Sequence, residues 1–149
     1  MAKYDARTTS RLLAVQALYQ MDIAKTPLET IIKEFKIYRV DNPLDGEVLP
    51  EPDIAYFEMI VRGVSDNQMT IDRMIDKLLS KSWRLGRLDS TLRAILRCGV
   101  QELIYSKTIA APIIVAQYSD IAHAFFEGAE GGMANALLDN VAATICPTT

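Results

Sequence analysis

The sequence has few residues of the kinds that form catalytic and metal sites. It holds two cysteines, Cys98 and Cys146, and one histidine, His123. No serine or cysteine has a motif that would pair it with His123 as a nucleophile, and these three residues do not complete a structural zinc site. The glycine-rich stretch EGAEGG lacks the Gly-Lys-Ser/Thr ending of a phosphate-binding loop. We therefore expect no catalytic residues, no metal and no cofactor.

Long apolar runs are missing as well. No stretch reaches the roughly 18 consecutive apolar residues typical of a membrane-spanning helix. The first residues, MAKYDARTTS, contain no apolar segment followed by a cleavage site. The low cysteine content argues against a disulfide framework. These absences predict a cytoplasmic protein with no membrane segment.

Aromatic residues make up only 7% of the chain, whereas 50% of its residues are hydrophobic. Apolar residues recur at spacings of three and four, which indicates amphipathic helices, and no segment shows the alternation of a strand. We expect an all-α protein of about seven helices in two small packed bundles, formed by residues 1–149 as one helical domain. The expected helices cover about 6–24, 28–37, 53–64, 70–83, 88–106, 111–126 and 133–145, with a long proline-containing loop at 38–52.

Positive charge is scarce overall, because the net charge is −3, and it is unevenly distributed. Seven lysines and arginines lie between Arg73 and Arg97 against two acids, and none follows Lys107. The segment has two interpretations: a solvated helix face, or a local basic surface on an acidic protein.

The first expected helix, ARTTSRLLAVQALYQ, is apolar on two sides and basic at its N-terminal end. Arg7 and Arg11 project from one side of it, and Tyr19 offers an aromatic ring two turns later. Arginines can bind phosphates and a tyrosine can stack on an unpaired base. Considered alone, the same pattern also fits two exposed arginines and a half-buried tyrosine with no ligand.

Several motifs along the chain decide between these interpretations. They are Arg11 with 14–19 (AVQALY), Phe57 with 61–64 (VRGV), Ile71-Asp72, Trp83 with Arg87-Leu88, 93–97 (RAILR) with Glu102-Leu103, and 135–139 (NALLD). In order and spacing this set resembles the NusB family of transcription antitermination factors over nearly the whole chain. The resemblance implies two helical bundles without catalytic activity. It also implies binding of single-stranded boxA RNA of ribosomal RNA transcripts, together with the ribosomal protein NusE, in an antitermination complex with RNA polymerase.

The resemblance also implies which residues bind RNA. Carried over position by position, they are Lys3, Arg7, Thr8, Arg11, Gln16, Tyr19, Met133 and Asn135. Asn135 has an alternative role, a hydrogen bond to the turn before the last helix. Replacing Arg7 and Arg11 by alanine is expected to weaken RNA binding and to leave helicity and melting unchanged.

The sequence has fewer cations than the family pattern at two places. Thr8 and Thr9 stand where relatives commonly have arginine, and Gly132-Met133 replaces a Lys-Phe pair. Each lost phosphate contact weakens binding, so we expect a lower RNA affinity and a larger contribution from NusE. The alternative is a protein-interaction module of NusB type with weakened or lost RNA binding. We do not expect an RNA methyltransferase with a NusB-like domain, because 149 residues leave no room for a cofactor-binding domain after the helices. A homodimer is possible.

Overall fold

The computed structural model describes residues 5–37 and 49–145, and all regular secondary structure in these ranges is helical. The elements are α1 (Ala6–Ala24), α2 (Leu28–Ile37), α3 (Ile54–Leu78), the short 3-10 helix η1 (Leu85–Arg87), α4 (Ser90–Tyr105), α5 (Ala111–Phe125) and α6 (Glu130–Ile145). The expected all-α class is confirmed. Most of the loop expected at 38–52 falls on residues 38–48, which lie outside the described residues.

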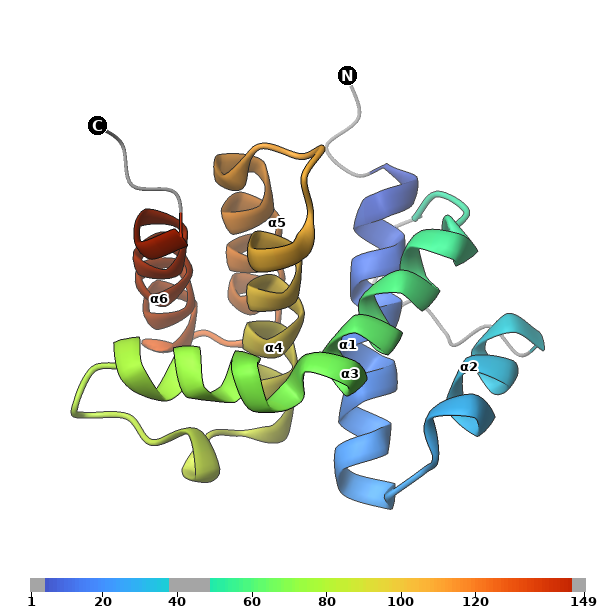
Figure 1. The fold of residues 1–149 in the computed structure, drawn as a ribbon, viewed down its shortest axis with the longest axis horizontal. Coiled ribbons are helices and arrows are strands. Elements are labelled where there is room, and N and C mark those ends of the chain that lie inside the picture. Colours follow the sequence, from blue (N-terminus) through green and yellow to red (C-terminus); the bar gives the residue numbers. More distant parts are fainter. Residues whose placement is uncertain (1–4, 38–48, 146–149) are drawn as a thin grey trace.

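The helices form two packed groups joined by α3. Helices α1, α4, α5 and α6 stand side by side, and α3 runs across α1 and α4 at a steep angle (Figure 1). Helix α2 packs on α1 and on the first part of α3, whereas the second part of α3 reaches α4 and α6. This arrangement places α1 in contact with α2, α3, α4 and α5.

Six helices occur instead of seven because the two expected between residues 53 and 83 are continuous. The expected break at residues 65–67 is a kink inside α3, where Asn67 departs from helical geometry with φ −115° and ψ 17°. The Asn67 side-chain amide donates to the carbonyl oxygen of Gly63 at 2.9 Å and so satisfies a carbonyl at the kink. Val64 and Ile71, on either side, are both buried, and this burial favours a bent helix over two separate ones.

The last helix begins three residues before the expected position, at Glu130, so Gly131 and Gly132 lie in its first turn. A Cβ atom on Gly131 would lie 2.6 Å from the ring of His123. The glycine therefore permits the first turn of α6 to approach the end of α5. Helix α5 begins at the expected Ala111-Pro112 pair, with proline in its first turn.

The two apolar sides of α1 are both explained by its central place. Leu12, Ala14, Val15 and Ala17 are each at most 1% exposed, so the helix is enclosed on both sides by its neighbours. An ion pair between Asp22 of α1 and Arg93 of α4, at 2.5 Å, fixes its far end. The second apolar stripe therefore needs no external partner.

Candidate functional site

Arg11 lies inside the protein. Its side chain has two hydrogen bonds to the carboxylate of Glu102 on α4, from Nε to Oε2 at 2.8 Å and from Nη2 to Oε1 at 3.1 Å. Nη1 donates to the Gln117 side chain at 3.0 Å, and Nη2 also donates to the Tyr56 hydroxyl at 3.0 Å. Arg11 and Glu102 are each 2% exposed. The guanidinium therefore joins α1 to α3, α4 and α5 in one buried network.

The network is arranged around the charge of Glu102. The hydroxyls of Tyr56 and Tyr118 both donate to its carboxylate. Burial, together with this carboxylate, raises the pKa of Tyr56 to about 12 and raises the pKa of Tyr118 well above its usual value. Burial opposes the charge on Arg11, but its hydrogen bonds to Glu102 outweigh that effect and its pKa is raised.

The expectation that Arg11 protrudes and contacts RNA is therefore wrong. Its donors are directed at Glu102, Gln117 and Tyr56, and no face of the guanidinium is open to a phosphate. The structure also changes the expected effect on stability: removing one partner of a buried ion pair leaves the other charge without compensation, so we now expect replacement of Arg11 to lower the melting temperature.

Thr8 is likewise unavailable as a phosphate ligand. It is 3% exposed, and its hydroxyl donates to the Gln117 side-chain oxygen at 2.8 Å. The Thr8 backbone N–H donates to the side chain of Asp5, which caps α1. In return, the Asp5 backbone N–H donates to the Thr8 hydroxyl oxygen. This capping box gives Thr8 a structural role at the start of α1. Lys3 lies outside the described residues.

Arg7 is the described cation of the first turn of α1 that does face solvent. Its guanidinium carbon lies 5.1 Å from the ring centre of Tyr56, and that of Arg11 lies 5.3 Å from the same centre. Within the described part of the chain the Arg7 side chain has no carboxylate partner. The Tyr56 ring therefore holds Arg7 by a cation–π contact that leaves its N–H donors free.

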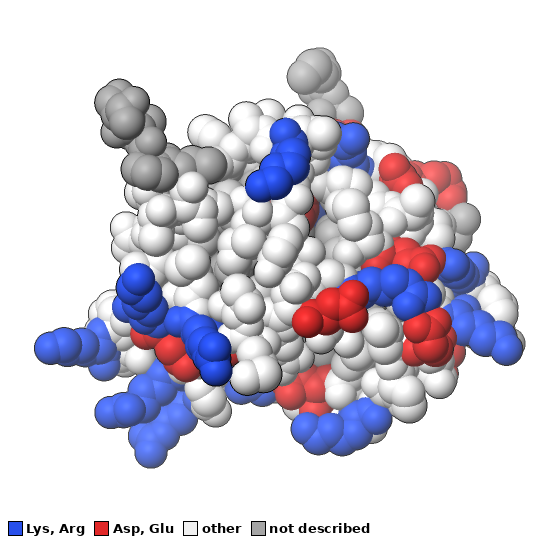
Figure 2. All heavy atoms as spheres, in the orientation of Figure 1, with Lys and Arg blue, Asp and Glu red and all other residues white. Residues whose placement is uncertain are grey.

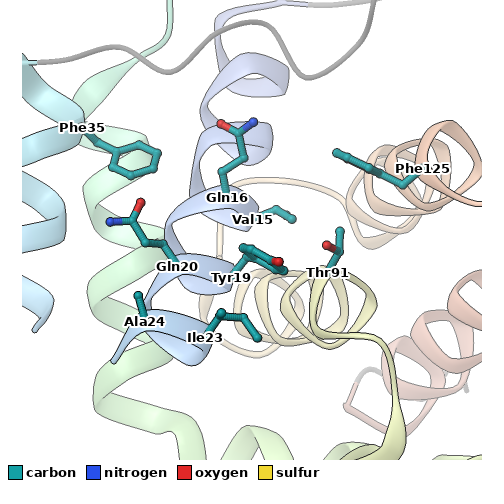
Figure 3. A pocket seen from close by; sticks show the side chains of 9 residues that line it. All are labelled: Val15, Gln16, Tyr19, Gln20, Ile23, Ala24, Phe35, Thr91 and Phe125. Atoms are coloured by element: carbon teal, nitrogen blue, oxygen red, sulfur yellow. The ribbon is translucent and has the colours of Figure 1, made fainter. Parts of the chain in front are cut away.

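Gln16 and Tyr19 lie elsewhere on α1. They line an apolar groove of about 380 Å³ that α1 forms with Phe35, Thr91 and Phe125 from α2, α4 and α5 (Figure 3). Tyr19 is 42% exposed, and the Oε1 atom of Gln16 is buried without a hydrogen-bond partner. At about 100° per residue, Gln16 projects opposite to Arg7. The structure thus does not bring Arg7 and these two residues onto one face.

Met133 and Asn135 lie in the first turns of α6, and α4 and α5 stand between this helix and α1 (Figure 1). Met133 is half-buried against the core, and Asn135 is exposed. The Asn135 side chain makes no hydrogen bond to any described residue, so the alternative bond to a preceding turn is not found. The candidate residues therefore occupy three separate places on the molecule.

Sequence reasoning missed the partners of Arg11, namely Tyr56, Glu102, Gln117 and Tyr118. A signal was present: Glu102 is an acid among Cys98, Gly99 and Leu103 on the apolar side of its helix, and Arg11 is a base among buried positions of α1. One acid and one base, each on an apolar helix face, indicate a buried pair, because a lone charge there would be strongly destabilising.

Other chemistry receives no support from the described residues. They contain no group of three or more histidine, cysteine or acidic side chains that could hold a metal ion, and no helix among them has the length and apolarity to cross a membrane. Cys98 is fully buried, and burial raises the pKa of its thiol well above the usual value. His123 bonds the carbonyl oxygen of Ser119 at 2.8 Å, within its own helix.

A model of the NusB family matches residues 8–143. The chain belongs to the NusB family. The transcription antitermination protein NusB of Caulobacter vibrioides is 43% identical to it, over 91% of each chain. A solved structure of T. maritima NusB is 27% identical, covers 97% of this chain and 95% of its own, and superposes with a TM-score of 0.78.

Family membership confirms the interpretation of the motifs as those of a non-enzymatic transcription antitermination factor of NusB type. A third match is a structure of antitermination factors NusB and NusE in complex with dsRNA. It is 22% identical, with a TM-score of 0.70 over 92% of this chain and 96% of that chain. At this identity the match establishes the shared fold.

Proposed function

We propose that the chain binds boxA RNA of ribosomal RNA transcripts together with NusE, and thereby acts in an antitermination complex with RNA polymerase in the cytoplasm. The observation that carries the proposal is the family match over residues 8–143. The related complex of NusB, NusE and RNA supports the choice of partners.

Arg7 is the phosphate-binding residue in this proposal. Its exposure, its lack of a carboxylate partner among the described residues and its support by the Tyr56 ring all favour contact with a polyanion. Asn135 and Met133 are proposed as contacts for a more distant part of the RNA, through the amide and the thioether side chain. Arg11 and Thr8 contribute indirectly, because they fix the first turn from which Arg7 projects.

An Arg7→Gln variant tests the RNA site. We expect weaker boxA binding and a salt slope lowered by about 0.7, the value for one lost contact on a single strand. Lys33→Gln is the matched control, since Lys33 is an exposed cation on α2 without a described carboxylate partner. Affinities are measured across a salt titration, with and without NusE. Equal affinities for the two variants would remove Arg7 from the site.

The apolar groove is the proposed docking surface for NusE. Tyr19, Ile23 and Phe125 are 42%, 56% and 38% exposed, and all three line it (Figure 3). Exposed apolar residues gathered in one hollow are typical of a protein interface, whereas RNA contacts need cations. The apolar surroundings of Tyr19 therefore favour a protein side chain over an RNA base.

Ile23→Ser and Ile37→Ser together test the groove. Both residues are strongly exposed, at 56% and 60%, but only Ile23 lines the groove. We expect Ile23→Ser to weaken NusE binding in the absence of RNA and Ile37→Ser to leave it unchanged. Binding is measured by calorimetry with purified NusE, after circular dichroism has established equal folding. If both variants bind NusE like the unmodified protein, the partner docks elsewhere.

A further inference from the structure

The basic segment between Arg73 and Arg97 divides into two parts with different roles. Arg93 and Arg97 form ion pairs with Asp22 and Asp72 at 2.5 and 2.9 Å, so both have a structural function. The other five cations have no carboxylate partner among the described residues and are exposed: Arg73, Lys77, Lys81, Arg84 and Arg87. They extend from the end of α3 through η1. Lysines and arginines gather over this part of the molecule at the lower left of Figure 2.

The surface around these cations is hollowed and contains an aromatic ring. Two adjacent hollows, of about 380 and 910 Å³, are both lined by Lys81, Trp83, Arg84 and Arg87. Trp83 is half-buried against the core and lines both hollows together with the three cations. An aromatic ring among cations is the usual composition of a surface that binds single-stranded nucleic acid.

Acidic residues do not neutralise this surface. Asp76, Asp89 and Glu130 line the same hollows. The Asp89 carboxylate is committed to capping α4, where it accepts from the Thr91 backbone N–H at 2.8 Å. The hollows themselves are lined by three cations and three acids, and the exposed Arg73 and Lys77 beside them give the whole surface two more cations than acids, on a protein whose net charge is −3. A partner that meets this surface is therefore anionic.

The surface is far from Arg7. Helix α1 is 19 residues long, or about 28 Å, with Arg7 at its start, and η1 lies at the opposite end of the molecule (Figure 1). We expect an RNA of boxA length bound at Arg7 to end before η1, and a longer transcript to reach it. Glu130, at the start of α6, borders the hollow, so the surface continues towards Met133 and Asn135.

We propose that the surface formed by Lys81, Trp83, Arg84 and Arg87, with Arg73 and Lys77 beside it, binds the single-stranded RNA that flanks the boxA element. The cations hold backbone phosphates and Trp83 stacks on a base, so this contact is independent of sequence. The proposal rests on the proposed RNA-binding function and extends it to a second site. It assigns a binding role to cations that the folded structure does not use.

Trp83 makes the test direct, because it is the single tryptophan of the chain. The probes are a boxA oligonucleotide and the same oligonucleotide extended at either end by about twelve adenosines, within the range of single-strand site sizes. We expect one extended probe to change Trp83 fluorescence and bind several-fold more tightly, and the short probe to leave the fluorescence unchanged. A fluorescence signal that no probe alters would overturn the proposal.

A triple variant, Lys81→Gln with Arg84→Gln and Arg87→Gln, should lose the fluorescence change. Its salt slope with the extended probe should fall by about 2, the value for three lost contacts, and its binding of the short probe should not change. The matched control, Lys25→Gln with Lys33→Gln and Lys107→Gln, alters the net charge equally through unpaired cations elsewhere. Equal losses in both triple variants would refute a specific surface.

Two further outcomes separate this proposal from the proposed function. If the first triple variant keeps its RNA binding and loses NusE binding instead, the surface is a protein interface and the proposal fails. If the unmodified protein binds no boxA probe, with or without NusE, the proposed function fails. Binding of adenosine tracts through Trp83 would then still support the second site.

Discussion

Arg11 provides the sharpest test of how the structure is held together. An Arg11→Met variant keeps much of the apolar stem but leaves the Glu102 carboxylate, 2% exposed, without its cation. Removing one partner of a buried ion pair costs about 3–5 kcal/mol. Because the Tyr56 and Tyr118 hydroxyls still donate to Glu102, we expect the lower end, about 3 kcal/mol. With an unfolding entropy scaled to chain length, this lowers the melting temperature by roughly 10 °C.

The decisive measurement is a double-mutant cycle with Glu102→Gln, followed by urea unfolding with circular dichroism. With Arg11 present, Glu102→Gln removes the compensating charge and should destabilise the protein. In the Arg11→Met background the same change removes an uncompensated buried charge and keeps a carbonyl acceptor for one of the two tyrosines, while the amide NH2 can donate to the hydroxyl of the other. The change should therefore stabilise the protein in this background. A coupling of about 2 kcal/mol or more is expected, since the two side chains are in direct contact. Additive effects, or a cost below about 1 kcal/mol for Arg11→Met, would refute the reasoning.

The remaining predictions concern pH, packing and thiol chemistry. The pKa of Tyr56 is raised from 10.0 to about 12, so its stabilising contribution is complete below pH 10 and is lost between pH 10 and 12. Tyr56→Phe should remove the part of this alkaline loss in unfolding free energy that Tyr56 causes, and a pH profile of stability identical to that of the unmodified protein would contradict the shift. A Cβ on Gly63 would lie 2.0 Å from Nε2 of Gln101, so Gly63→Ala should destabilise the protein by about 1–3 kcal/mol in urea, and less when combined with Gln101→Ala. In a Cys146→Ser variant a thiol reagent should label Cys98 only as fast as the protein opens, and rapid labelling of the folded protein would show that Cys98 is accessible.

The helices were predictable because their causes are local. Apolar residues at spacings of three and four predicted α1, α2, α4 and α5 close to their observed bounds. Two predicted helix boundaries, the break near residues 65–67 and the start of the last helix, were wrong because tertiary packing determines them. Residues packed on both sides of Asn67 make the two expected helices continuous in α3. Gly131 lies in the first turn of α6, where the helix packs closely against His123.

The binding residues were predictable only in part, because exposure is a tertiary property. The sequence placed Arg7 and Arg11 four residues apart on one helix and could not distinguish them. The fold places Glu102, Gln117 and Tyr56 around Arg11 and leaves Arg7 on the outer side of the Tyr56 ring. The same applies to Arg93 and Arg97, which form ion pairs, whereas Arg84 and Arg87 remain without a carboxylate partner among the described residues.

By itself, then, the sequence determined the helical class, the family and the absence of a catalytic motif, since spacing and residue type are sufficient for these. The tertiary structure decided which arginines are structural and which are free to bind. The physical reason is that a buried guanidinium is stable only beside a carboxylate, and the Arg11 carboxylate comes from a residue 91 positions away in the chain.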